Sequence, residues 1–510
     1  MQKSSSNPRI GWDIVLAAAI SGMAVMSIEI LASRLLAPAL GSSVLVWTNL
    51  IGVVLLSLAA GAWFGGYSSD RYRDRRLLGV FLFAAGISAS FLPFSYQIAV
   101  WIISFIPEIY ALPLLALILL APTAFLLGAV PPAAIRLALH EVGEAGHIAG
   151  RLNAIGALGS LAGTYFTGYV LLAVWPVNWI LAGISVCLFL SGIALLRPLA
   201  KKNILASLFG FSLIAVGQTA EAPEGIIIPS RYSAMRVSEH ELPDGTINIL
   251  WMDNARHGAA IKTDKSNSLF SFYQLFNDFS HLLAPNAKHF LSIGGGTFHA
   301  SRLWISNGAD RTATAIERDP AAIEASKRFF DLQDNPRLAI VHGDGRASLA
   351  SIGEKFDAVF IDAYADHMTI PWHLITVEAW ANLRSYLADD AFVAMNFVIH
   401  RDQSLDANRK LISGTVNAAK TSFKYVTIVN IGNKYSPTNI ANTLLLLSNT
   451  REPKDEEIRE ILQKNKVLSD PITYPLITDA FPAFTDQYAP VEYLSAQIVS
   501  TEKARIRARD

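Results

Sequence analysis

The chain has 510 residues, of which 52% are hydrophobic and 16% are charged, a balance that is too apolar for a wholly soluble protein. Basic and acidic residues number 42 each, but residues 1–220 hold 12 basic and 7 acidic residues, which leaves 30 and 35 for the remainder. The acidic second part has no basic run after Lys202, which argues against a nucleic-acid partner. The single cysteine, Cys187, excludes disulfide frameworks and thiolate metal clusters.

Long apolar runs dominate residues 1–220, and a bilayer core about 30 Å thick needs roughly 20 such residues to be crossed by a helix. The sequence predicts a bundle of about seven membrane-spanning helices, at residues 14–36, 45–66, 77–97, 111–133, 152–174, 178–197 and 203–219. The apolar segment 98–110 is short and contains Pro107 and Glu108, which favours an interfacial helix between the third and fourth spans.

Basic residues between these runs predict which side of the membrane each connection occupies. They fall in alternate connections, namely Lys3 and Arg9; Arg71, Arg73, Arg75 and Arg76; Arg136 and Arg151; and Arg197, Lys201 and Lys202. The positive-inside rule places these connections and the N-terminus in the cytoplasm, as expected for a multi-pass protein of the cell (inner) membrane. The seventh run fits a last span or an internal signal peptide, and either interpretation exports everything after about residue 220.

After about Ile226 the pattern changes to that of a globular protein. Short β-type runs at 226–228, 234–239 and 246–252, with a hairpin turn at Asp244 and Gly245, predict a small antiparallel lead-in domain over residues 221–285. Over residues 286–510, strands at 289–293, 312–317, 338–342, 356–361 and 391–398 alternate with helices at 298–306, 320–330 and 374–388. This alternation predicts a parallel Rossmann-like sheet covered on both faces. A helix at 406–421, strands at 425–431 and 442–449, and a helix at 454–465 complete the domain.

Four successive strands end in residues that suit a nucleoside. Gly294, Gly295 and Gly296 expose backbone at a helix start, where free N–H groups face a ligand. Glu317 ends the next strand, 21 residues after Gly296, where a carboxylate can accept ribose hydroxyls. Asp344 and Asp362 end the third and fourth strands. Each carboxylate taken singly also fits a helix cap or a solvated loop, but the ordered set predicts an adenosyl-ligand site.

Residues 230–500 resemble the spermidine/spermine synthase (polyamine aminopropyltransferase) family. The resemblance is carried by Ser230-Arg-Tyr232, the three glycines at 294–296, Glu317, Asp344-Gly345 and Asp362. Residues 29–76 are similar to the membrane portion of proteins in which a transporter-like bundle is fused to a synthase-like domain. The resemblance implies a multi-pass helical bundle over 1–220, a small β-domain, and a methyltransferase-type Rossmann-like sheet over 286–510.

The activity implied by this resemblance is transfer of the propylamine arm of decarboxylated S-adenosylmethionine to an amine, which leaves methylthioadenosine. The implied catalytic residues are Asp362 and Asp366, of which Asp362 holds the amine and takes its proton. The residues implied for the donor are Gly294, Gly295, Gly296, Thr297, Glu317, Asp344 and Gly345. Those expected near the acceptor are Tyr232, His257, Tyr273 and Tyr364. The donor is a co-substrate, no permanently bound cofactor is expected, and His299 and His342 lack a second ligand at metal spacing.

The sequence departs from the family at one residue that helps to hold the donor's amino group and at several on the acceptor side. Thr297 stands where the family has an aspartate, and the family's Asp-x-x-Asp-Pro is stretched to Asp362-Ala-Tyr-Ala-Asp366. Ser268-Leu269 and Phe272-Tyr273-Gln274 replace the acidic residues that cradle a polyamine. These changes leave open an S-adenosylmethionine-dependent methyltransferase, or a transporter or sensor whose globular domain binds a polyamine or nucleoside without catalysis.

The expected partners are a small-molecule amine, the adenosyl donor and the lipid bilayer, and a homodimer is left open. Because sulfonium donors are made in the cytoplasm, export of the second part conflicts with the implied chemistry. Either the seventh run does not cross, or the bundle delivers the donor, or the pocket binds an extracytoplasmic ligand. Near the end of the chain, Thr485-Asp486 before Pro490 and Glu492 resembles a closing loop of the fused proteins.

Overall fold

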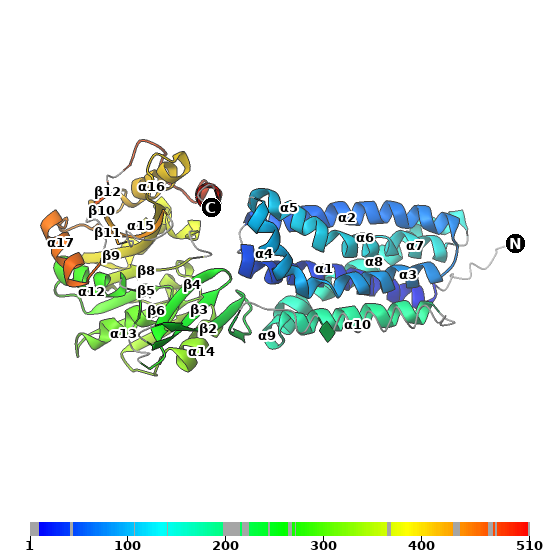
Figure 1. The fold of residues 1–510 in the computed structure, drawn as a ribbon, viewed down its shortest axis with the longest axis horizontal. Helices are drawn as coiled ribbons and strands as arrows, with labels where there is room; N and C mark the ends of the chain where they lie inside the picture. The colour runs from blue at the N-terminus through cyan, green and yellow to red at the C-terminus, as the bar shows by residue number, and fades with distance from the viewer. Residues whose placement is uncertain are drawn as a thin grey trace. The chain divides into compact units, whose positions relative to one another are not determined.

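The chain forms two compact units, Met1–Glu224 and Gly225–Asp510, which are shown in Figure 1. The structure is a computed structural model that describes residues 10–40, 44–106, 108–139, 141–196, 215–216, 224–242, 245–263, 268–270, 272–364, 369–431, 439–467, 473–474 and 477–507. The described part of the first unit is helical, and the second unit contains two β-sheets with helices packed against them.

The first unit is built from apolar helices. They are α1 (Trp12–Leu40), α2 (Val44–Arg71), α3 (Arg76–Ala89), α4 (Ser95–Phe105), α5 (Glu108–Leu119), α6 (Ala121–Gly128), α7 (Val130–Ala138), α8 (Ala145–Tyr165), α9 (Leu172–Val174) and α10 (Val177–Leu195). Among the described residues, 6 helical stretches are long and apolar enough to cross a membrane. The predicted seventh span at 203–219 lies outside the described residues apart from 215 and 216, so the count of seven stays a prediction.

Two predicted boundaries in this unit were wrong. The third apolar stretch runs from Arg76 to Ile103 with a short turn of 3-10 helix at Leu92–Phe94, so much of the segment predicted to be interfacial continues the third stretch. The predicted span 111–133 is divided between α5 and the later stretch Ala121–Ala138. Pro122 in the first turn of α6 accounts for the break before Ala121, because proline lacks the N–H that would continue the preceding helix.

Small residues let α1 and α8 approach closely. A Cβ atom on Gly159 would lie 2.2 Å from the carbonyl oxygen of Ala19, and one on Gly163 would lie 2.4 Å from that of Met23. Just after α8 ends, the Thr167 hydroxyl donates a buried hydrogen bond of 2.9 Å to the Ser27 hydroxyl of α1. Close contacts between small residues are the usual way in which helices pack in lipid, because an apolar side chain gains little free energy when it moves from lipid to a helix interface.

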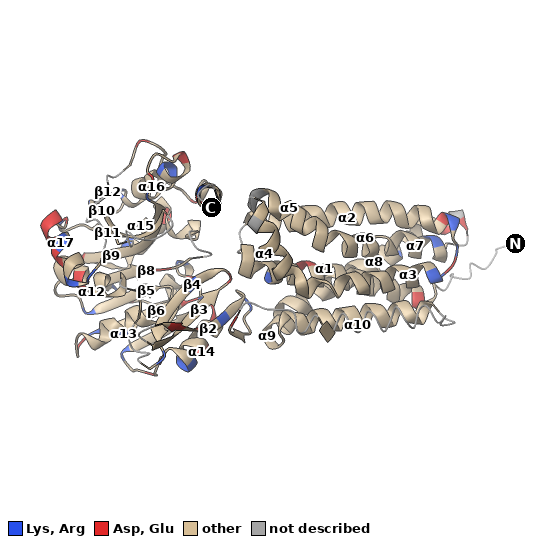
Figure 2. Ribbon diagram, viewed as in Figure 1, with Lys and Arg blue, Asp and Glu red and all other residues tan. Residues whose placement is uncertain are grey.

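Most charged residues of the helical unit gather at the end where α1 and α3 begin (Figure 2). Arg75 Nη1 lies 2.8 Å from Asp13 Oδ2, which joins the starts of α3 and α1. Arg136 Nε lies 2.5 Å from Asp70 Oδ1, which joins the ends of α7 and α2. These basic connections, predicted to share one side of the membrane, therefore lie at the same end of the bundle.

The second unit begins with a four-stranded antiparallel sheet in the order β1-β2-β3-β4. Its strands are β1 (Ile226–Ile228), β2 (Met235–Leu242), β3 (Gly245–Met252) and β4 (Ala255–Ile261). The sequence missed β4, which follows a turn in which Asp253 adopts a φ of 52° and its carboxylate accepts a 2.8 Å hydrogen bond from the Ala234 amide. Of the predicted hairpin pair, Asp244 lies outside the described residues and Gly245 has a φ of 124°.

The main sheet has eight strands in the order β12-β10-β11-β9-β8-β5-β6-β7. They are β5 (His289–Ile293), β6 (Thr312–Glu317), β7 (Leu338–His342), β8 (Phe356–Ile361), β9 (Leu387–His400), β10 (Tyr425–Asn430), β11 (Ile440–Ser448) and β12 (Thr473–Tyr474). β5 to β9 are parallel, but β11 pairs antiparallel with β9 and β10, and β12 pairs antiparallel with β10. The prediction of a parallel sheet was therefore wrong at this edge. The sheet is mixed, and its strand order is methyltransferase-like.

Helices cover both faces of this sheet (Figure 1). They are α12 (Phe272–Leu283), α13 (His299–Ser306), α14 (Pro320–Phe329), α15 (Val377–Ser385), α16 (Asp406–Ala419), α17 (Asp455–Lys464) and α18 (Val491–Arg507). One apolar core packs α15, α16 and α18 against the sheet, and another packs α12, α13 and α17 against the opposite face. The helix predicted at 374–388 is shorter, because β9 already begins at Leu387. α12 and α18 were not predicted.

Candidate active site

The loop between β5 and α13 contains three glycines that a larger residue cannot replace without displacing its neighbours. Gly294 has a φ of 94°, and a Cβ atom there would lie 2.3 Å from the carbonyl oxygen of Asp362. Gly296 has a φ of 51°, and its Cβ atom would lie 2.9 Å from the carbonyl oxygen of His257. Only glycine adopts these two φ angles without strain. The short Cβ distances show that the loop backbone lies against the end of β8 and against strand β4.

Glu317, at the end of β6, holds this loop through its carboxylate. One oxygen accepts hydrogen bonds from the amides of Gly295 and Gly296, at 2.9 and 3.1 Å, and the other accepts one of 2.9 Å from the Asp319 amide. Burial raises the pKa of Glu317 although these three hydrogen bonds oppose the shift. A carboxylate has about four acceptor positions, so backbone groups already occupy most of the capacity predicted for a ribose.

Asp344, after β7, is also engaged with neighbouring groups. One oxygen accepts two backbone hydrogen bonds of 3.0 Å, from Arg346 and Ala347, and the other lies 3.0 Å from His373 Nε2. Burial opposes the ionised form, but these hydrogen bonds and the His373 charge together lower the pKa of Asp344. Arg346 in turn binds both carboxylate oxygens of Asp486 at 2.8 Å, so the closing loop predicted from the sequence is tied to this strand end.

A cavity of about 610 Å³ opens beside the glycine loop. Among the residues predicted for the site, those that line it are Gly294, Gly295, Gly296, Asp362, Tyr364, Tyr273 and His257. The predicted residues Thr297, Glu317, Asp344, Gly345 and Tyr232 are described but are not part of this lining. Asp366 and His367 lie outside the described residues. The structure thus brings the glycine loop together with three of the four acceptor-side candidates, His257, Tyr273 and Tyr364, around Asp362.

Asp362 is held by two side chains from other elements. Its Oδ1 accepts a 2.9 Å hydrogen bond from Asn396 Nδ2 on β9, and its Oδ2 accepts one of 3.3 Å from the Tyr273 hydroxyl on α12. Burial raises the pKa of Asp362, and the two hydrogen bonds oppose this shift. With two acceptor positions filled, a carboxylate retains about two more for a ligand.

Tyr273 is part of a buried group that supports the glycine loop. Burial, with the nearby Asp362 charge, raises the pKa of Tyr273 well above its ordinary value, so the phenol stays protonated and donates. Its ring is stacked on His299, at 6.2 Å between centroids. The His299 Nδ1 atom lies 2.6 Å from the hydroxyl of fully buried Thr297. Thr297 and His299 therefore support Tyr273 from behind the cavity.

The remaining aromatic candidates have different surroundings. The Tyr364 hydroxyl donates to the Asn396 carbonyl at 2.6 Å and accepts from the Val398 amide at 3.0 Å, so it fixes the end of β8 to β9. Tyr232 is 42% exposed, with its ring 6.4 Å from that of His342 and 5.2 Å from the Arg318 guanidinium. Tyr232 therefore lies at the ends of β6 and β7, away from the cavity lining around Asp362.

Sequence reasoning missed Asn396, which lines the cavity and is 6% exposed. Its Oδ1 atom has no hydrogen-bond partner among the described residues, although its Nδ2 atom donates to Asp362. The available signal was a single polar residue inside the apolar run Ala391–Val398. His373, which binds Asp344, was also missed, because 29 residues separate the two and no local spacing connects them.

Comparison with known proteins identifies the domain that carries this site. Residues 270–435 match the family model described as "Spermine/spermidine synthase domain". A probable polyamine aminopropyl transferase from Bifidobacterium longum is 27% identical over 158 residues, which cover 31% of this chain and 35% of the relative. The polyamine aminopropyltransferase of Thermotoga neapolitana is 25% identical over 169 residues, which cover 32% of this chain and 55% of the relative. The chain thus spans between about a third and about half of these relatives.

Solved structures include similar proteins. A probable spermidine synthase from Corynebacterium glutamicum matches with 15% identity and a TM-score of 0.44, over 52% of this chain and 98% of that one. The spermidine synthase of Thermotoga maritima matches with 18% identity and a TM-score of 0.33, over 55% of this chain and 87% of that one.

The family match includes the glycine loop, Glu317, Asp344, Asp362 and Asn396, and it ends before α18. The second unit of this chain therefore contains a spermine/spermidine synthase domain.

Proposed function

We propose that the second unit catalyses aminopropyl transfer from decarboxylated S-adenosylmethionine to an amine. The observation that carries this proposal is the position of Asp362, a carboxylate with spare acceptor capacity that lines a cavity together with the glycine loop. The family match over residues 270–435 and the relatives named polyamine aminopropyltransferase support the same reaction. The donor is consumed as a co-substrate.

In this proposal the donor nucleoside binds along the ends of β5, β6 and β7. The exposed backbone of the glycine loop contacts it, and Glu317 acts by fixing the amides of Gly295 and Gly296. Its remaining acceptor position is available to a ribose hydroxyl. Asp344, whose carboxylate is part exposed beside His373, lies where the adenine edge is expected. The reactive sulfonium then faces the cavity that Asp362 lines.

The reaction proposed here needs little covalent chemistry from the protein. The amine nitrogen forms a bond to the donor carbon next to the sulfonium while the carbon–sulfur bond breaks, and its electrons stay on sulfur, which leaves methylthioadenosine. An ammonium has no lone pair, so the amine must lose a proton before or during attack. In this proposal Asp362 accepts that proton, and the Asn396 amide nitrogen holds the Asp362 carboxylate through its hydrogen bond. Alignment of the two reactants supplies the rest of the rate enhancement.

The products distinguish this reaction from methyl transfer on the same type of sheet. The full-length protein incubated with decarboxylated S-adenosylmethionine and an amine is expected to release methylthioadenosine in proportion to the transferred propylamine. Release of S-adenosylhomocysteine from S-adenosylmethionine, with no turnover of the decarboxylated donor, would show a methyltransferase instead. Chromatography of both nucleosides in one assay provides the measurement.

On acidification, the rate of transfer is expected to fall at a higher pH than it would if an exposed aspartate accepted the proton. Burial raises the pKa of Asp362, and the proposed mechanism needs its ionised form. The rate therefore rises with pH through this raised pKa, which lies above the value of about 3.9 for an exposed aspartate. A kcat profile between about pH 3 and 8 tests this. Asp389→Asn, which removes an exposed carboxylate on β9, is the control. An acid limb below about pH 4 would exclude Asp362 as the proton acceptor.

We also propose that the six apolar stretches span the membrane and that the basic end of the bundle faces the cytoplasm. Six crossings return the chain to the cytoplasmic side, whereas a seventh at 203–219 exports the second unit. A reporter fused after residue 510 is expected to be active on the cytoplasmic side if the domain uses donor made there. An extracytoplasmic reporter would require that the bundle deliver the donor or that the pocket bind a different ligand.

A further inference from the structure

The closing segment, residues 484–490, leads into α18 and lies beyond the residues that match the family model, which end at 435. Phe484, at its start, is fully buried. The Phe484 carbonyl accepts a 2.8 Å hydrogen bond from the Val377 amide, and the Phe484 amide donates one of 3.1 Å to the Gly414 carbonyl. The start of the closing segment is therefore fixed to α15 and α16.

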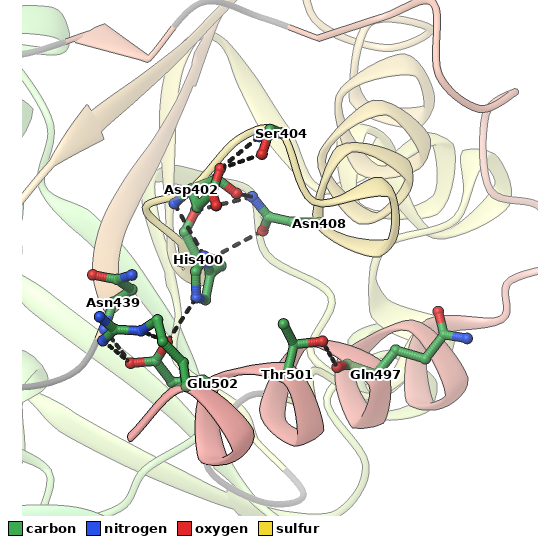
Figure 3. Close-up of polar contacts among 9 residues, drawn as sticks. His400, Asp402, Ser404, Asn408, Asn439, Gln497, Thr501 and Glu502 are labelled. Carbon is green, nitrogen blue, oxygen red and sulfur yellow. Dashed lines mark hydrogen bonds and ion pairs between the residues drawn. The ribbon is translucent and has the colours of Figure 1, made fainter. Parts of the chain in front are cut away.

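The other end of the closing segment continues into α18, which is docked on the end of β9 (Figure 3). Glu502 Oε2 accepts hydrogen bonds from His400 Nε2 at 3.0 Å and from Arg505 Nε at 2.7 Å. The side chains of His400 and Glu502 are each 2% exposed. Because buried contacts hold the chain on both sides of the closing segment, Asp486 lies at a fixed position between them.

Asp486 forms a two-point ion pair with Arg346, which follows β7. Arg346 Nη1 lies 2.8 Å from Asp486 Oδ1, and Nη2 lies 2.8 Å from Oδ2. The Thr376 hydroxyl donates a 2.6 Å hydrogen bond to Oδ1, and the Asp486 amide donates one of 2.9 Å to Glu378. The hydrogen bonds from Arg346 are the largest cause of the lowered pKa of Asp486, so this carboxylate is ionised at neutral pH. A planar guanidinium that is held at two points has a fixed orientation as well as a fixed position.

Arg346 orients the Asp344 carboxylate by two routes. Its amide and that of Ala347 each donate a 3.0 Å hydrogen bond to Asp344 Oδ1. Its Nη1 atom donates to the His373 carbonyl at 3.2 Å, and the His373 Nε2 atom lies 3.0 Å from Asp344 Oδ2. Because an ionised carboxylate can only accept, His373 Nε2 carries the proton of that hydrogen bond. The pair Asp486–Arg346 and the pair Asp344–His373 therefore form one connected network.

Asp344 keeps about one acceptor position for a ligand. Of its roughly four positions, the two backbone amides fill two and His373 fills a third. The side chain of Asp344 is 38% exposed, as a ligand contact requires. The amino group of adenine donates a hydrogen bond, whereas an oxopurine has an accepting oxygen at the same carbon. A carboxylate with a fixed direction therefore distinguishes the two bases.

We propose that Asp486, through its two-point contact with Arg346, orients Asp344 and so gives the donor site its selectivity for adenine over an oxopurine. This inference rests on the function proposed above and assigns a role to the closing segment. Asp486 and Arg346 are positioning residues, because they act on the base only through Asp344. When the guanidinium is released, the Arg346 amide and the His373 carbonyl lose their common support, and the Asp344 carboxylate is no longer held in one direction.

Two nucleosides that differ only in this group of the base test the proposal. Methylthioadenosine carries the amino group and methylthioinosine carries the oxygen, and calorimetric titration of the full-length protein gives Kd for each. The wild type is expected to bind methylthioadenosine about 30-fold more tightly, as one hydrogen bond to a charged group predicts. Asp486→Asn is expected to lower this ratio to about threefold, while kcat at saturating donor changes less than about twofold because Asp362 is untouched.

Arg346→Lys tests the same contact from the other partner. Lysine keeps the charge but cannot make the two-point contact, so the ratio is expected to fall as it does in Asp486→Asn. The double variant should show no further fall, because both single changes break one contact. Asp334→Asn is the control, since it removes an exposed ion pair with Lys327 of 2.7 Å in the same unit and should leave the ratio unchanged.

The ratio of the two Kd values does not depend on the folded fraction of a variant, because both nucleosides bind the same folded molecules. An equal loss of affinity for both nucleosides in Asp486→Asn, with an unchanged ratio, would show that Asp486 serves the fold alone and would overturn the inference. A wild type that binds both nucleosides equally would also overturn it, while release of methylthioadenosine from the donor would still support aminopropyl transfer. Binding of neither nucleoside would overturn the proposed function and this inference with it.

Discussion

Replacement of Asp362 by asparagine is expected to lower kcat about 10²- to 10⁴-fold, the range for removal of a general base, while the donor still binds. Asparagine keeps the shape of the side chain and one oxygen that can accept from Asn396 or Tyr273. It cannot take a proton from the amine at neutral pH. The variant is measured by methylthioadenosine release under saturating donor and acceptor, and donor binding is measured separately by calorimetry.

Asp389→Asn is the matched control for this experiment. Its carboxylate is fully exposed on the same strand that carries Asn396, so its loss should leave kcat and donor binding unchanged. An Asp362→Asn protein that turned over at the wild-type rate would remove Asp362 from the mechanism. A variant that lost donor binding as well would show that Asp362 holds the donor and not only the acceptor.

Glu317→Ala is expected to abolish donor binding and to destabilise the second unit. The substitution removes the acceptor of the amides of Gly295, Gly296 and Asp319. A buried N–H group that loses its hydrogen-bond acceptor costs about 1–3 kcal/mol of folding free energy, so the loss of the acceptor for three N–H groups predicts a total of several kcal/mol. Without this carboxylate, the glycine loop also loses the contact that holds its backbone open to the nucleoside. Calorimetric titration with methylthioadenosine and thermal unfolding provide the two measurements.

Glu354→Ala, which removes an exposed carboxylate of the same unit, is the control and should change neither quantity. Glu317→Gln separates the roles of shape and charge, because its amide oxygen can still accept from the glycine loop. Donor binding retained in Glu317→Gln and lost in Glu317→Ala supports the loop-holding role. Unchanged binding in both variants would show that the glycine loop does not depend on Glu317.

Local sequence patterns were sufficient to predict the five parallel strands, because each contains a short apolar run between turn residues. Strands 312–317, 338–342 and 356–361 were predicted with the bounds that the structure has. The antiparallel edge was not predictable in this way, because strand direction at β10 and β11 depends on which neighbours pair. The break near Leu120 in the helical unit could have been predicted from the sequence, because Pro122 lies in the first turn of α6.

Some residues around the cavity were also predictable from local sequence patterns, and others were not. The glycine loop and Asp362 follow strands, so their neighbourhood was predictable from the rule that parallel strand ends meet at one edge. Asn396 and α18 were not predictable, because Asn396 lies within a strand and α18 reaches the cavity only after the whole sheet has formed. The network of Glu317 with the glycine amides likewise depends on the three-dimensional approach of β5 and β6.

The most direct test of this account is a calorimetric titration of the full-length protein in detergent with methylthioadenosine and with decarboxylated S-adenosylmethionine. Saturable binding of both at one site, lost in Glu317→Ala and retained in Asp362→Asn, is the predicted result. The absence of binding by either ligand at millimolar concentration would contradict the assignment of the glycine loop and the adjoining ends of β5, β6 and β7 to an adenosyl donor.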